Sequence, residues 1–416
     1  MTKKSDAPAI RFKGFSDAWE QRKFDEVFDC TVPNNTLSRA ELSYDEGTVL
    51  NVHYGDVLIK YGSVLDVQKD DIPRIPHRCR EDFNGALLQD GDVIIADTAE
   101  DETTGKACEI GNLQGSAIVS GLHTMVCRPR NRMALGYLGY YLNSNAYHHQ
   151  LLPLMQGIKV LSLSRSNIQK TSVSYPIAVK EQQLIAYYFS QLDNLITLHQ
   201  RKCALLFSPF QAFISMMFIT STFSWEQRKL GDMMNVTSVK RIHQSDWTDS
   251  GVRFLRARDI VAAAKNEEPD DYLYISKEKY EEYSTLSGKV GVSDLLVTGV
   301  GTIGVPYLVR NLEPLYFKDG NIIWFQNSDK IDGKFLFYSF SAEQIQGFIN
   351  ESAGIGTVGT YTIESGKKTP ISLPNQIEQA KVGEFFQQLD NLITLHQREL
   401  EKLQNIKKSM LEKMFV

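Results

Sequence analysis

The stretch QLDNLITLHQR spans Gln191–Arg201, and the same eleven residues occur again at Gln388–Arg398. A second identical stretch, WEQRK, precedes each copy, at Trp19–Lys23 and at Trp225–Lys229. The segments between these matches have almost wholly different sequences. The chain is therefore one long unit written twice. This arrangement predicts a common scaffold that holds two different binding domains.

Apolar residues recur at steps of three and four through both copies of the repeated stretch and beyond it. This spacing is the a/d pattern of a coiled-coil seam, sustained over about four heptads. Each predicted helix follows a proline, Pro176 or Pro374, and carries Glu-Gln near its start, at Glu181 and Glu378, where an acidic group complements the helix dipole. The predicted seam consists of Phe189, Leu192, Ile196, His199 and Leu206 in the first helix and Phe386, Leu389, Ile393, His396, Leu400 and Leu403 in the second.

Two such seams in one chain most simply pack against each other. The alternative is that each helix packs only against its own globular domain, but seams of this length exceed what one small domain could cover. If a two-fold axis relates the repeats, the helices run antiparallel, and His199 and His396 near their midpoints could approach each other. A histidine on an apolar stripe is more often a packing residue than a ligand, so we assign both a packing role and expect no metal site.

The segments between the repeats have a different pattern from the helices. Short apolar runs such as Asp92–Ala96 and Asn321–Phe325 alternate with Gly, Asn and Asp turns, and helical stretches follow at 135–149 and 334–349. This predicts an α+β domain with mostly antiparallel strands, present twice and joined by the two antiparallel coiled-coil helices. Pro209 is expected to kink or end the first helix. The predicted segments are a first domain over 1–178, a helix over 179–219, a second domain over 220–375 and a helix over 376–416.

Composition excludes several classes of protein. The chain has 416 residues, enough for two or more domains that each bury a core. Its five cysteines form no C-x-x-C pair, which argues against a structural zinc site or a disulfide framework and favours the reducing cytoplasm. The N-terminus lacks an apolar signal region, and the most apolar stretch, Ala204–Ile219, is interrupted by polar residues, so no membrane role is expected.

Catalytic motifs are missing from the sequence. Two G-x-G-x-x-G matches, at Gly299–Gly304 and Gly354–Gly359, are followed by residues typical of strands rather than of the helix that a dinucleotide site needs, so we interpret them as tight turns. The chain has no P-loop, no H-E-x-x-H and no Asn/Asp-Pro-Pro-aromatic tetrad. The acidic run at 97–102 is interpreted as a solvated loop. No catalytic residue is predicted.

Basic residues recur in clusters in both domains, among aromatic and amide side chains. The net charge of −5 does not exclude nucleic acid, because binding depends on where Lys and Arg gather. One such cluster alone is more often a solvated face, but recurrence in both domains favours DNA, since Arg can bond guanine edges and Lys neutralises phosphate. The candidate DNA-binding residues are Arg74, Arg78, Arg80, Arg128, Arg130, Lys159 and Arg165 in the first domain and Lys240, Arg241, Arg256, Arg258, Lys367 and Lys368 in the second.

With these features together, the chain resembles the specificity subunit of Type I restriction-modification enzymes over nearly its full length. The order of variable domain, helix, variable domain and helix is the most specific element. The usual charged helix end is absent near Pro209, which puts the docking surface there in doubt. The matching residues are Arg11–Phe15, Trp19–Lys23, Phe223–Lys229, Glu181, Glu378, both copies of the repeat, Lys413–Phe415, Gly91–Val93 and Gly304.

The resemblance implies a non-catalytic subunit that recognises a bipartite double-stranded DNA target, one half-site per domain, with the paired helices setting the spacing. It also implies two methyltransferase subunits and nuclease-translocase subunits as partners. S-adenosylmethionine, ATP and Mg²⁺ would then be bound by those partners and not by this chain. Two alternatives stay open, namely a fused restriction-methylation enzyme and a two-domain scaffold for a non-DNA ligand such as protein or carbohydrate.

Overall fold

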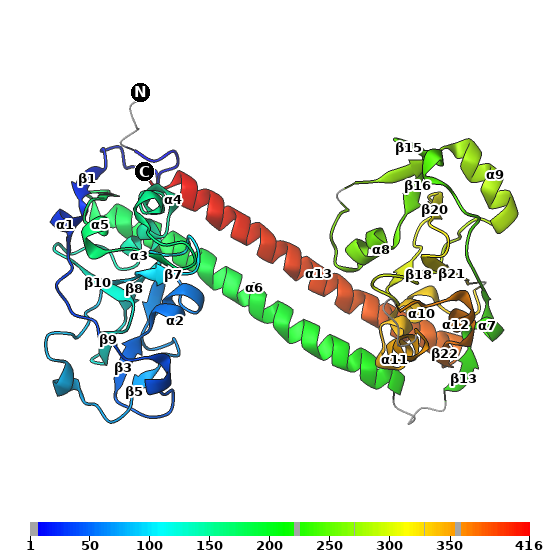
Figure 1. The fold of residues 1–416 in the computed structure, drawn as a ribbon, viewed down its shortest axis with the longest axis horizontal. Coiled ribbons are helices and arrows are strands. Elements are labelled where there is room, and N and C mark those ends of the chain that lie inside the picture. The colour runs from blue at the N-terminus through cyan, green and yellow to red at the C-terminus, as the bar shows by residue number, and fades with distance from the viewer. Residues whose placement is uncertain (1–6, 220–224, 270, 328, 354–358) are drawn as a thin grey trace. The chain divides into compact units, whose positions relative to one another are not determined.

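The computed structural model describes residues 7–219, 225–269, 271–327, 329–353 and 359–416, without the side chains of 208, 209, 211, 213, 215 and 217–219. The chain divides into two compact units (Figure 1). The first unit comprises Met1–Leu198 and Leu400–Val416, and the second comprises His199–Glu399. Each unit therefore contains one globular domain together with part of each long helix.

In the first unit, the globular domain (residues 7–178, the first domain) is built on a five-stranded sheet with the order β2-β10-β6-β8-β4. A three-stranded sheet, β5-β3-β9, and two strand pairs, β1-β12 and β11-β7, complete it. The strands are β1 (Glu20–Lys23), β2 (Phe28–Asp29), β3 (Val49–Val52), β4 (Val64–Asp66), β5 (Arg74–Ile75), β6 (Val93–Ala96), β7 (Thr98–Ala99), β8 (Ala107–Gly111), β9 (Ala117–Ser120), β10 (Thr124–Pro129), β11 (Leu161–Ser162) and β12 (Ser172–Tyr175). The helices are α1 (Phe24–Val27), η1 (Arg39–Glu41), α2 (Tyr54–Ile59), η2 (Arg80–Phe83), α3 (Tyr137–Leu142), α4 (Asn145–His148), η3 (Leu152–Leu154), α5 (Arg165–Ile168) and the long α6 (Val179–Ile219).

In the second unit, the globular domain (residues 225–375, the second domain) repeats this plan with a four-stranded sheet, β14-β21-β18-β19, and a second sheet, β15-β17-β16-β20. The strand pair β13-β22 corresponds to β1-β12. The strands are β13 (Glu226–Lys229), β14 (Asn235–Thr237), β15 (Trp247–Thr248), β16 (Val252–Leu255), β17 (Leu273–Ile275), β18 (Leu295–Thr298), β19 (Pro306–Leu308), β20 (Leu315–Phe317), β21 (Ile322–Gln326) and β22 (Pro370–Leu373). The helices are α7 (Leu230–Met233), η4 (Gln244–Asp246), α8 (Ala257–Ala264), α9 (Lys277–Ser287), α10 (Gly333–Phe340), α11 (Glu343–Ser352), α12 (Ile363–Lys368) and the long α13 (Gln376–Lys413).

The predicted α+β class with mostly antiparallel strands is confirmed, since parallel pairing is limited to β3-β9, β4-β8 and β16-β20 among the described strands. The central strand β6 has the sequence VIIA and is buried throughout, because it has a core on each face. Val93 and Ile95 pack into the core that contains α3, whereas Ile94 and Ala96 pack into the core beneath α2. The predicted helical stretches at 135–149 and 334–349 are confirmed, and each contains two helices, α3 and α4 in the first domain and α10 and α11 in the second.

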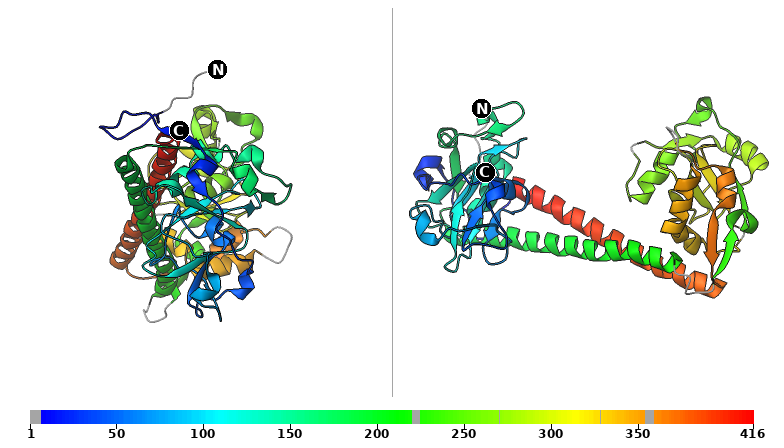
Figure 2. Two further views of the ribbon diagram at one scale, coloured as in Figure 1. Left: turned by 90° about the vertical axis from the view of Figure 1, so that its left-hand side faces the viewer. Right: turned by 60° about the horizontal axis from the view of Figure 1, so that its bottom comes forward.

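Within each unit, α6 and α13 run antiparallel, as predicted (Figure 2). In the first unit Phe189 stacks on Phe415 at 5.6 Å between ring centroids, and Nζ of Lys407 lies 2.5 Å from Oδ1 of Asp193. In the second unit the rings of Phe210 and Phe386 meet edge to face at 5.8 Å. Every predicted seam residue is buried or half-buried. The seam therefore pairs the two helices inside one chain, and the alternative of separate packing was wrong.

The sequence predicted that Pro209 would kink or end the first helix. The second of these expectations was wrong, since α6 continues to Ile219. Phe210 follows the proline directly, Ile214 lies about one turn further on, and both are buried in the core of the second unit. Packing of these side chains holds the last turns helical even though proline removes one backbone hydrogen bond.

The first G-x-G-x-x-G match, Gly299–Gly304, joins β18 to β19 and is a turn between strands, as predicted. Most of the second match, 354–358, lies outside the described residues. The strand expected directly after it was wrong. Helix α12 begins there at Ile363, because the Thr362 hydroxyl accepts a hydrogen bond from the backbone N–H of Ser365 at 3.2 Å and caps the helix.

Candidate nucleic-acid interface

Each domain is held on its long helix by a glutamine at the helix start. The Gln182 side chain accepts a hydrogen bond from the Ala134 N–H at 2.9 Å and donates one to the Pro176 carbonyl at 2.8 Å. Gln379 makes the same pair of bonds, with the Asp332 N–H at 3.0 Å and the Pro374 carbonyl at 2.8 Å. The repeated Glu-Gln therefore attaches a domain to a helix, in addition to the dipole role predicted from the sequence.

The repeated stretch makes a second matching contact through its aspartate. The Tyr140 hydroxyl donates to Asp193 at 2.8 Å, and the Tyr338 hydroxyl donates to Asp390 at 3.4 Å. In both domains this tyrosine lies six positions after the backbone N–H that the glutamine binds. In each unit, the backbone N–H and the tyrosine hydroxyl are therefore spaced to meet the glutamine and the aspartate of the long helix.

The other repeated stretch, WEQRK, completes the attachment. The ring of Trp19 packs edge to face on Tyr137 at 6.2 Å, and Trp225 packs in the same way on Phe335 at 5.8 Å. The residues after each tryptophan form β1 and β13, which pair with the strand that leads into the long helix. We name the repeated tryptophan, glutamine and aspartate of each unit its anchor. Both anchors hold a short aromatic helix, α3 or α10.

Several predicted DNA contacts are occupied by ion pairs inside their own domain. Arg128 binds Asp92 through two hydrogen bonds of 2.8 and 2.7 Å. Arg256 bonds Asp259 and Asp271; burial lowers its pKa, but these hydrogen bonds outweigh that effect and the net pKa is raised. Arg258 also pairs with Asp271. Arg128 and Arg256 therefore brace the fold, and their contact with DNA stays a prediction.

The other predicted basic residues are exposed on their domains. Arg74 and Arg80 each donate to a carbonyl, of Tyr44 and Gly115, whereas Arg241 pairs with Asp319 at 3.1 Å. Arg74 lies on β5, Arg78 in the turn after it and Arg80 at the start of η2. The remaining members lie on several elements, namely loops for Arg130, Lys159 and Lys240, α5 for Arg165, and α12 for Lys367 and Lys368.

An exposed apolar loop tip is the feature that the sequence argument missed. Ile158 is fully exposed and Val160 is 51% exposed, on either side of the exposed Lys159. Gly157 before them has a φ of +127°, and a Cβ there would lie 1.9 Å from the Val160 carbonyl oxygen, so glycine is required. The signal was the Gly-Ile pair before a capped helix, which recurs as Gly354-Ile355 before α12. We name residues 157–160 the tip loop.

The long helices also expose leucines at matching places in the repeat. Leu195 and Leu198 on α6 are 44% and 47% exposed, and Leu392 and Leu395 on α13 are 39% and 51% exposed. The seam uses the neighbouring positions, so these leucines form a second apolar stripe on each helix. In the described part of the chain, no helix combines the length and apolarity of a membrane span.

The fold and its anchors define a class of protein in which two unlike domains are held by one repeated helical scaffold. A family model described as the Type I restriction modification DNA specificity domain matches residues 16–206 and 224–405. The chain therefore belongs to this family. Membership favours DNA recognition over the alternative of a scaffold for a non-DNA ligand.

Two relatives from Methanocaldococcus jannaschii are similar in sequence. The Type I restriction enzyme MjaVIII specificity subunit is 26% identical over 56% of this chain and 59% of its own length. The putative type I restriction enzyme MjaX specificity subunit is 21% identical over 94% of this chain and 92% of its own length. The match to the first relative thus spans about three fifths of that protein.

Two solved structures share the fold. The crystal structure of a Type I restriction-modification S subunit from M. genitalium aligns with a TM-score of 0.62 at 12% identity, over 99% of both chains. A chain from work on complex assembly and conformational transition of the type I R-M system aligns with a TM-score of 0.51 at 15% identity, over 94% of this chain and 96% of that chain. These likenesses concern the fold alone.

Proposed function

We propose that this chain is the non-catalytic DNA-specificity subunit of a type I restriction-modification complex, with one half of a bipartite target recognised by each domain. The observation that carries the proposal is the matched pair of anchors, Trp19, Gln182 and Asp193 against Trp225, Gln379 and Asp390. Attachment of two unlike domains by the same three residue types suits a protein whose variable parts determine specificity and whose constant parts determine assembly. The family match supports the same role.

In the first domain, the tip loop is the best candidate for a groove contact. Lys159 can neutralise a phosphate, and Ile158 supplies an apolar group that can contact a thymine methyl or enter a base step. Arg78 and Arg165 are exposed as well and can add phosphate contacts. Burial of Ile158 against a base would remove a fully exposed apolar side chain from water, which favours binding.

The exposed leucine stripes are candidate docking surfaces for the methyltransferase subunits. Leu195 and Leu198 repeat as Leu392 and Leu395, so one partner surface could bind either helix in the same way. Two equivalent stripes suit two methyltransferase copies, joined by the restriction-translocase subunits. S-adenosylmethionine, ATP and Mg²⁺ would be bound by those partners.

The test is an exchange of residues 230–372 for the same segment of another family member, assembled with the methyltransferase partner. One half of the methylated motif should change and the other should stay, because the domains share no core. A control exchange of 24–173 should change the opposite half. An altered motif in both halves, or binding that does not weaken with salt, would contradict DNA recognition by independent domains.

A further inference from the structure

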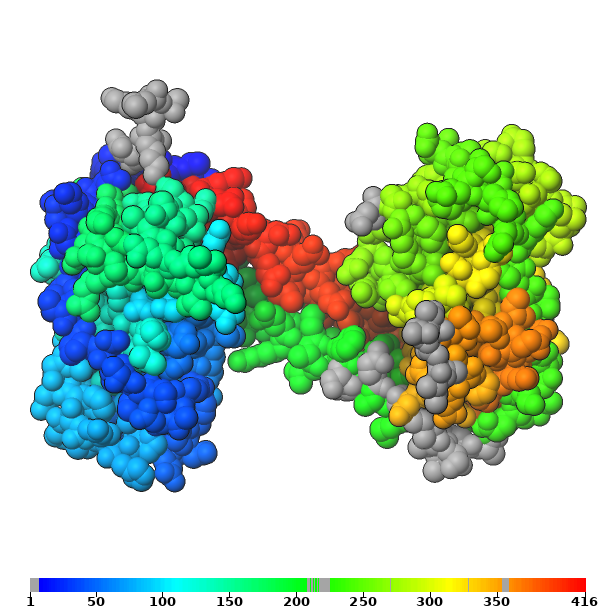
Figure 3. All heavy atoms as spheres, viewed as in Figure 1, coloured from blue at the N-terminus to red at the C-terminus, as the bar shows by residue number. Residues whose placement is uncertain are grey.

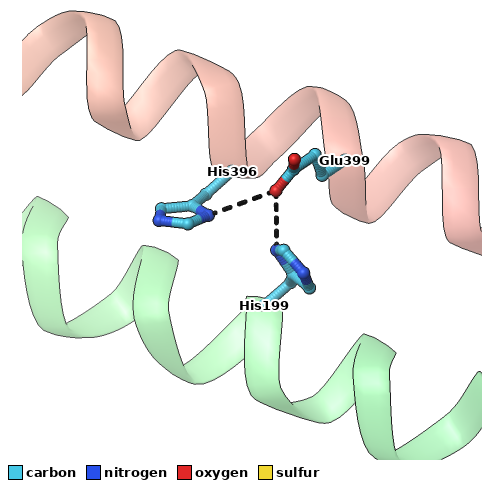
Figure 4. Close-up of side chains that lie close together, drawn as sticks. All are labelled: His199, His396 and Glu399. Atoms are coloured by element: carbon cyan, nitrogen blue, oxygen red, sulfur yellow. Dashed lines mark ion pairs between the residues drawn. The ribbon is translucent and has the colours of Figure 1, made fainter. Parts of the chain in front are cut away.

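Two histidines and one glutamate meet between α6 and α13 in the second unit (Figure 4). Nδ1 of His199 lies 3.4 Å from Oε2 of Glu399, and Nδ1 of His396 lies 3.5 Å from the same oxygen. The two imidazole rings are 5.4 Å apart between centroids, so the predicted approach of the two histidines is confirmed. One ligand atom from each of the three residues falls within 4.8 Å of the others.

These atoms lack the hydrogen bonds that a packing role would require. Nδ1 of His199 and Nδ1 of His396 are both buried, and within the described residues neither has a hydrogen-bond partner. Contacts of 3.4 and 3.5 Å to Glu399 are too long for a normal N–H···O bond. A buried polar atom without a partner costs about 1–3 kcal/mol. Something other than packing is therefore needed to account for two such atoms aimed at one carboxylate.

The separations suit a tetrahedral metal centre instead. With metal–ligand bonds of about 2.0–2.1 Å, neighbouring ligand atoms of a tetrahedron lie about 3.3–3.4 Å apart. The two distances to Glu399 agree with that edge. Imidazole and carboxylate ligands are those that Zn²⁺ and related divalent transition metals accept, and three protein ligands leave a fourth position for water.

We propose that His199, His396 and Glu399 form a binding site for a divalent transition metal of the zinc type, which links α6 to α13. Each histidine side chain is 15% exposed and the glutamate is 46% exposed, so an ion can enter from the glutamate side. This assignment revises the packing role that the sequence suggested for the histidines. It is independent of the DNA-recognition proposal.

The two copies of the repeat contribute unequally to the site. Both histidines occupy the same position of the repeated stretch, but the residue that matches Glu399 in the first copy is Lys202. A lysine cannot serve as a second carboxylate ligand. Among the described residues, this is the one candidate metal site on the helix pair. Glu399→Lys would convert the second copy to the residue that the first copy carries.

The test is titration of the full-length, chelator-treated chain with Co²⁺, which shows visible d–d bands when bound in a tetrahedral site. We expect one Co²⁺ per chain, displaced by Zn²⁺. Glu399→Gln, Glu399→Lys and His396→Gln should each weaken the affinity at least about tenfold, since loss of a mere supporting contact already costs that much. Glu401→Gln, an exposed carboxylate two positions further on, and Cys203→Ser are matched controls that should leave the affinity unchanged.

Unfolding supplies a second readout. Zn²⁺ should raise the unfolding temperature of the parent chain and of Glu401→Gln, because a ligand bound only by the folded state stabilises it. It should not raise that of Glu399→Gln, a half-exposed position where the variant itself is expected to fold. Absence of Co²⁺ binding, binding that is unaffected at Glu399 and His396, or a thiolate charge-transfer band that disappears in Cys203→Ser would each overturn the proposal.

Discussion

In both domains an aspartate closes the turn before a central strand, but the further partners of its carboxylate differ between the domains. Asp92, before β6, accepts a hydrogen bond from the Gln89 N–H at 2.8 Å, and Asp294, before β18, accepts one from the Gly291 N–H at 2.8 Å. In the first domain the carboxylate also binds the Arg128 guanidinium. In the second it binds the indole N–H of Trp324 at 2.8 Å and the Asn327 N–H at 2.8 Å.

The same sheet position also holds different side chains. Val93 of β6 lies opposite Glu109 of β8, and the equivalent Leu295 of β18 lies opposite Leu308 of β19. Glu109 is buried and accepts the Gly139 N–H at 2.8 Å, whereas Leu308 packs in an apolar core. The backbone plan is thus constant while the polar interior is free to change. The anchors, by contrast, keep their residue types and the pattern of their contacts, although the Tyr–Asp hydrogen bond is 2.8 Å long in the first unit and 3.4 Å long in the second.

The largest effect should come from breaking the Asp92–Arg128 pair. Asp92→Asn removes the charge that compensates a largely buried guanidinium, and we expect a loss of about 3 kcal/mol in the free energy of unfolding of the first domain. Asp294→Asn is the matched variant. Its partners are neutral donors and burial raises the pKa of Asp294, so the loss should be about 1 kcal/mol.

Urea unfolding followed by hydrogen exchange of peptides from each domain would measure both losses separately. Equal losses would show that the arginine adds nothing to the turn.

A second comparison uses pH. Burial raises the pKa of Glu109 to about 7, so the folded first domain favours the protonated side chain. Its stabilising effect is complete below the ordinary glutamate pKa and is lost as pH rises through about 7, by up to about 3 kcal/mol. Glu109→Gln should remove this decline between pH 4.5 and 7, because it retains an acceptor for Gly139 without a charge.

The second domain, with Leu308 at the equivalent position, should show no such decline, and its hydrogen exchange in the same samples is the control. A decline that persists in Glu109→Gln would assign it to other groups.

The anchors should respond alike in the two units. Gln182→Ala and Gln379→Ala each leave a backbone N–H and a carbonyl without partners, and we expect about 2 kcal/mol of destabilisation in each domain. Hydrogen exchange of α3 and α10 would report the two effects. Gln200→Ala, an exposed glutamine of the repeated stretch, should have little effect. A large difference between the two anchor variants would show that equal geometry does not mean equal attachment.

The smallest effect concerns the tip loop. Lys159→Ala should weaken DNA binding about threefold to tenfold at moderate salt and lower the slope of log affinity against log salt by about one. Lys170→Ala, an exposed lysine of the first domain outside the tip loop, is the control and should change neither quantity. Fluorescence anisotropy with the assembled complex, at several salt concentrations, would measure both. Unchanged affinity and slope for Lys159→Ala would remove the tip loop from the interface.

The helical scaffold could be predicted from the sequence because its signals are local and occur twice. The a/d spacing predicted the seam, and the duplication predicted its antiparallel direction. The role of Gln182 could not be predicted, because its partner Ala134 is distant in the sequence and is brought close by the fold. The ion pair of Arg128 could not be predicted for the same reason, since Asp92 precedes it by a full strand and its connections.

Burial decides the remaining cases. Pro209 lies in a helix that packing holds together, and Ile158 is exposed although its residue type favours the interior. The end of α13 is a further case, and Figure 3 shows its last turns lying against the first domain. Phe415 there contacts Trp19, Tyr137 and Tyr141. No heptad rule predicts an aromatic contact of that kind.

The matched anchors have a consequence for inheritance. Since tryptophan, glutamine and aspartate meet an aromatic ring, a backbone N–H and a tyrosine hydroxyl in both units, a domain excised between the repeats would fit either attachment site. The same two peptide stretches flank both domains, so a gene that encodes them with similar codons would offer recombination a place to cross over. New specificities could then arise by exchange of whole domains.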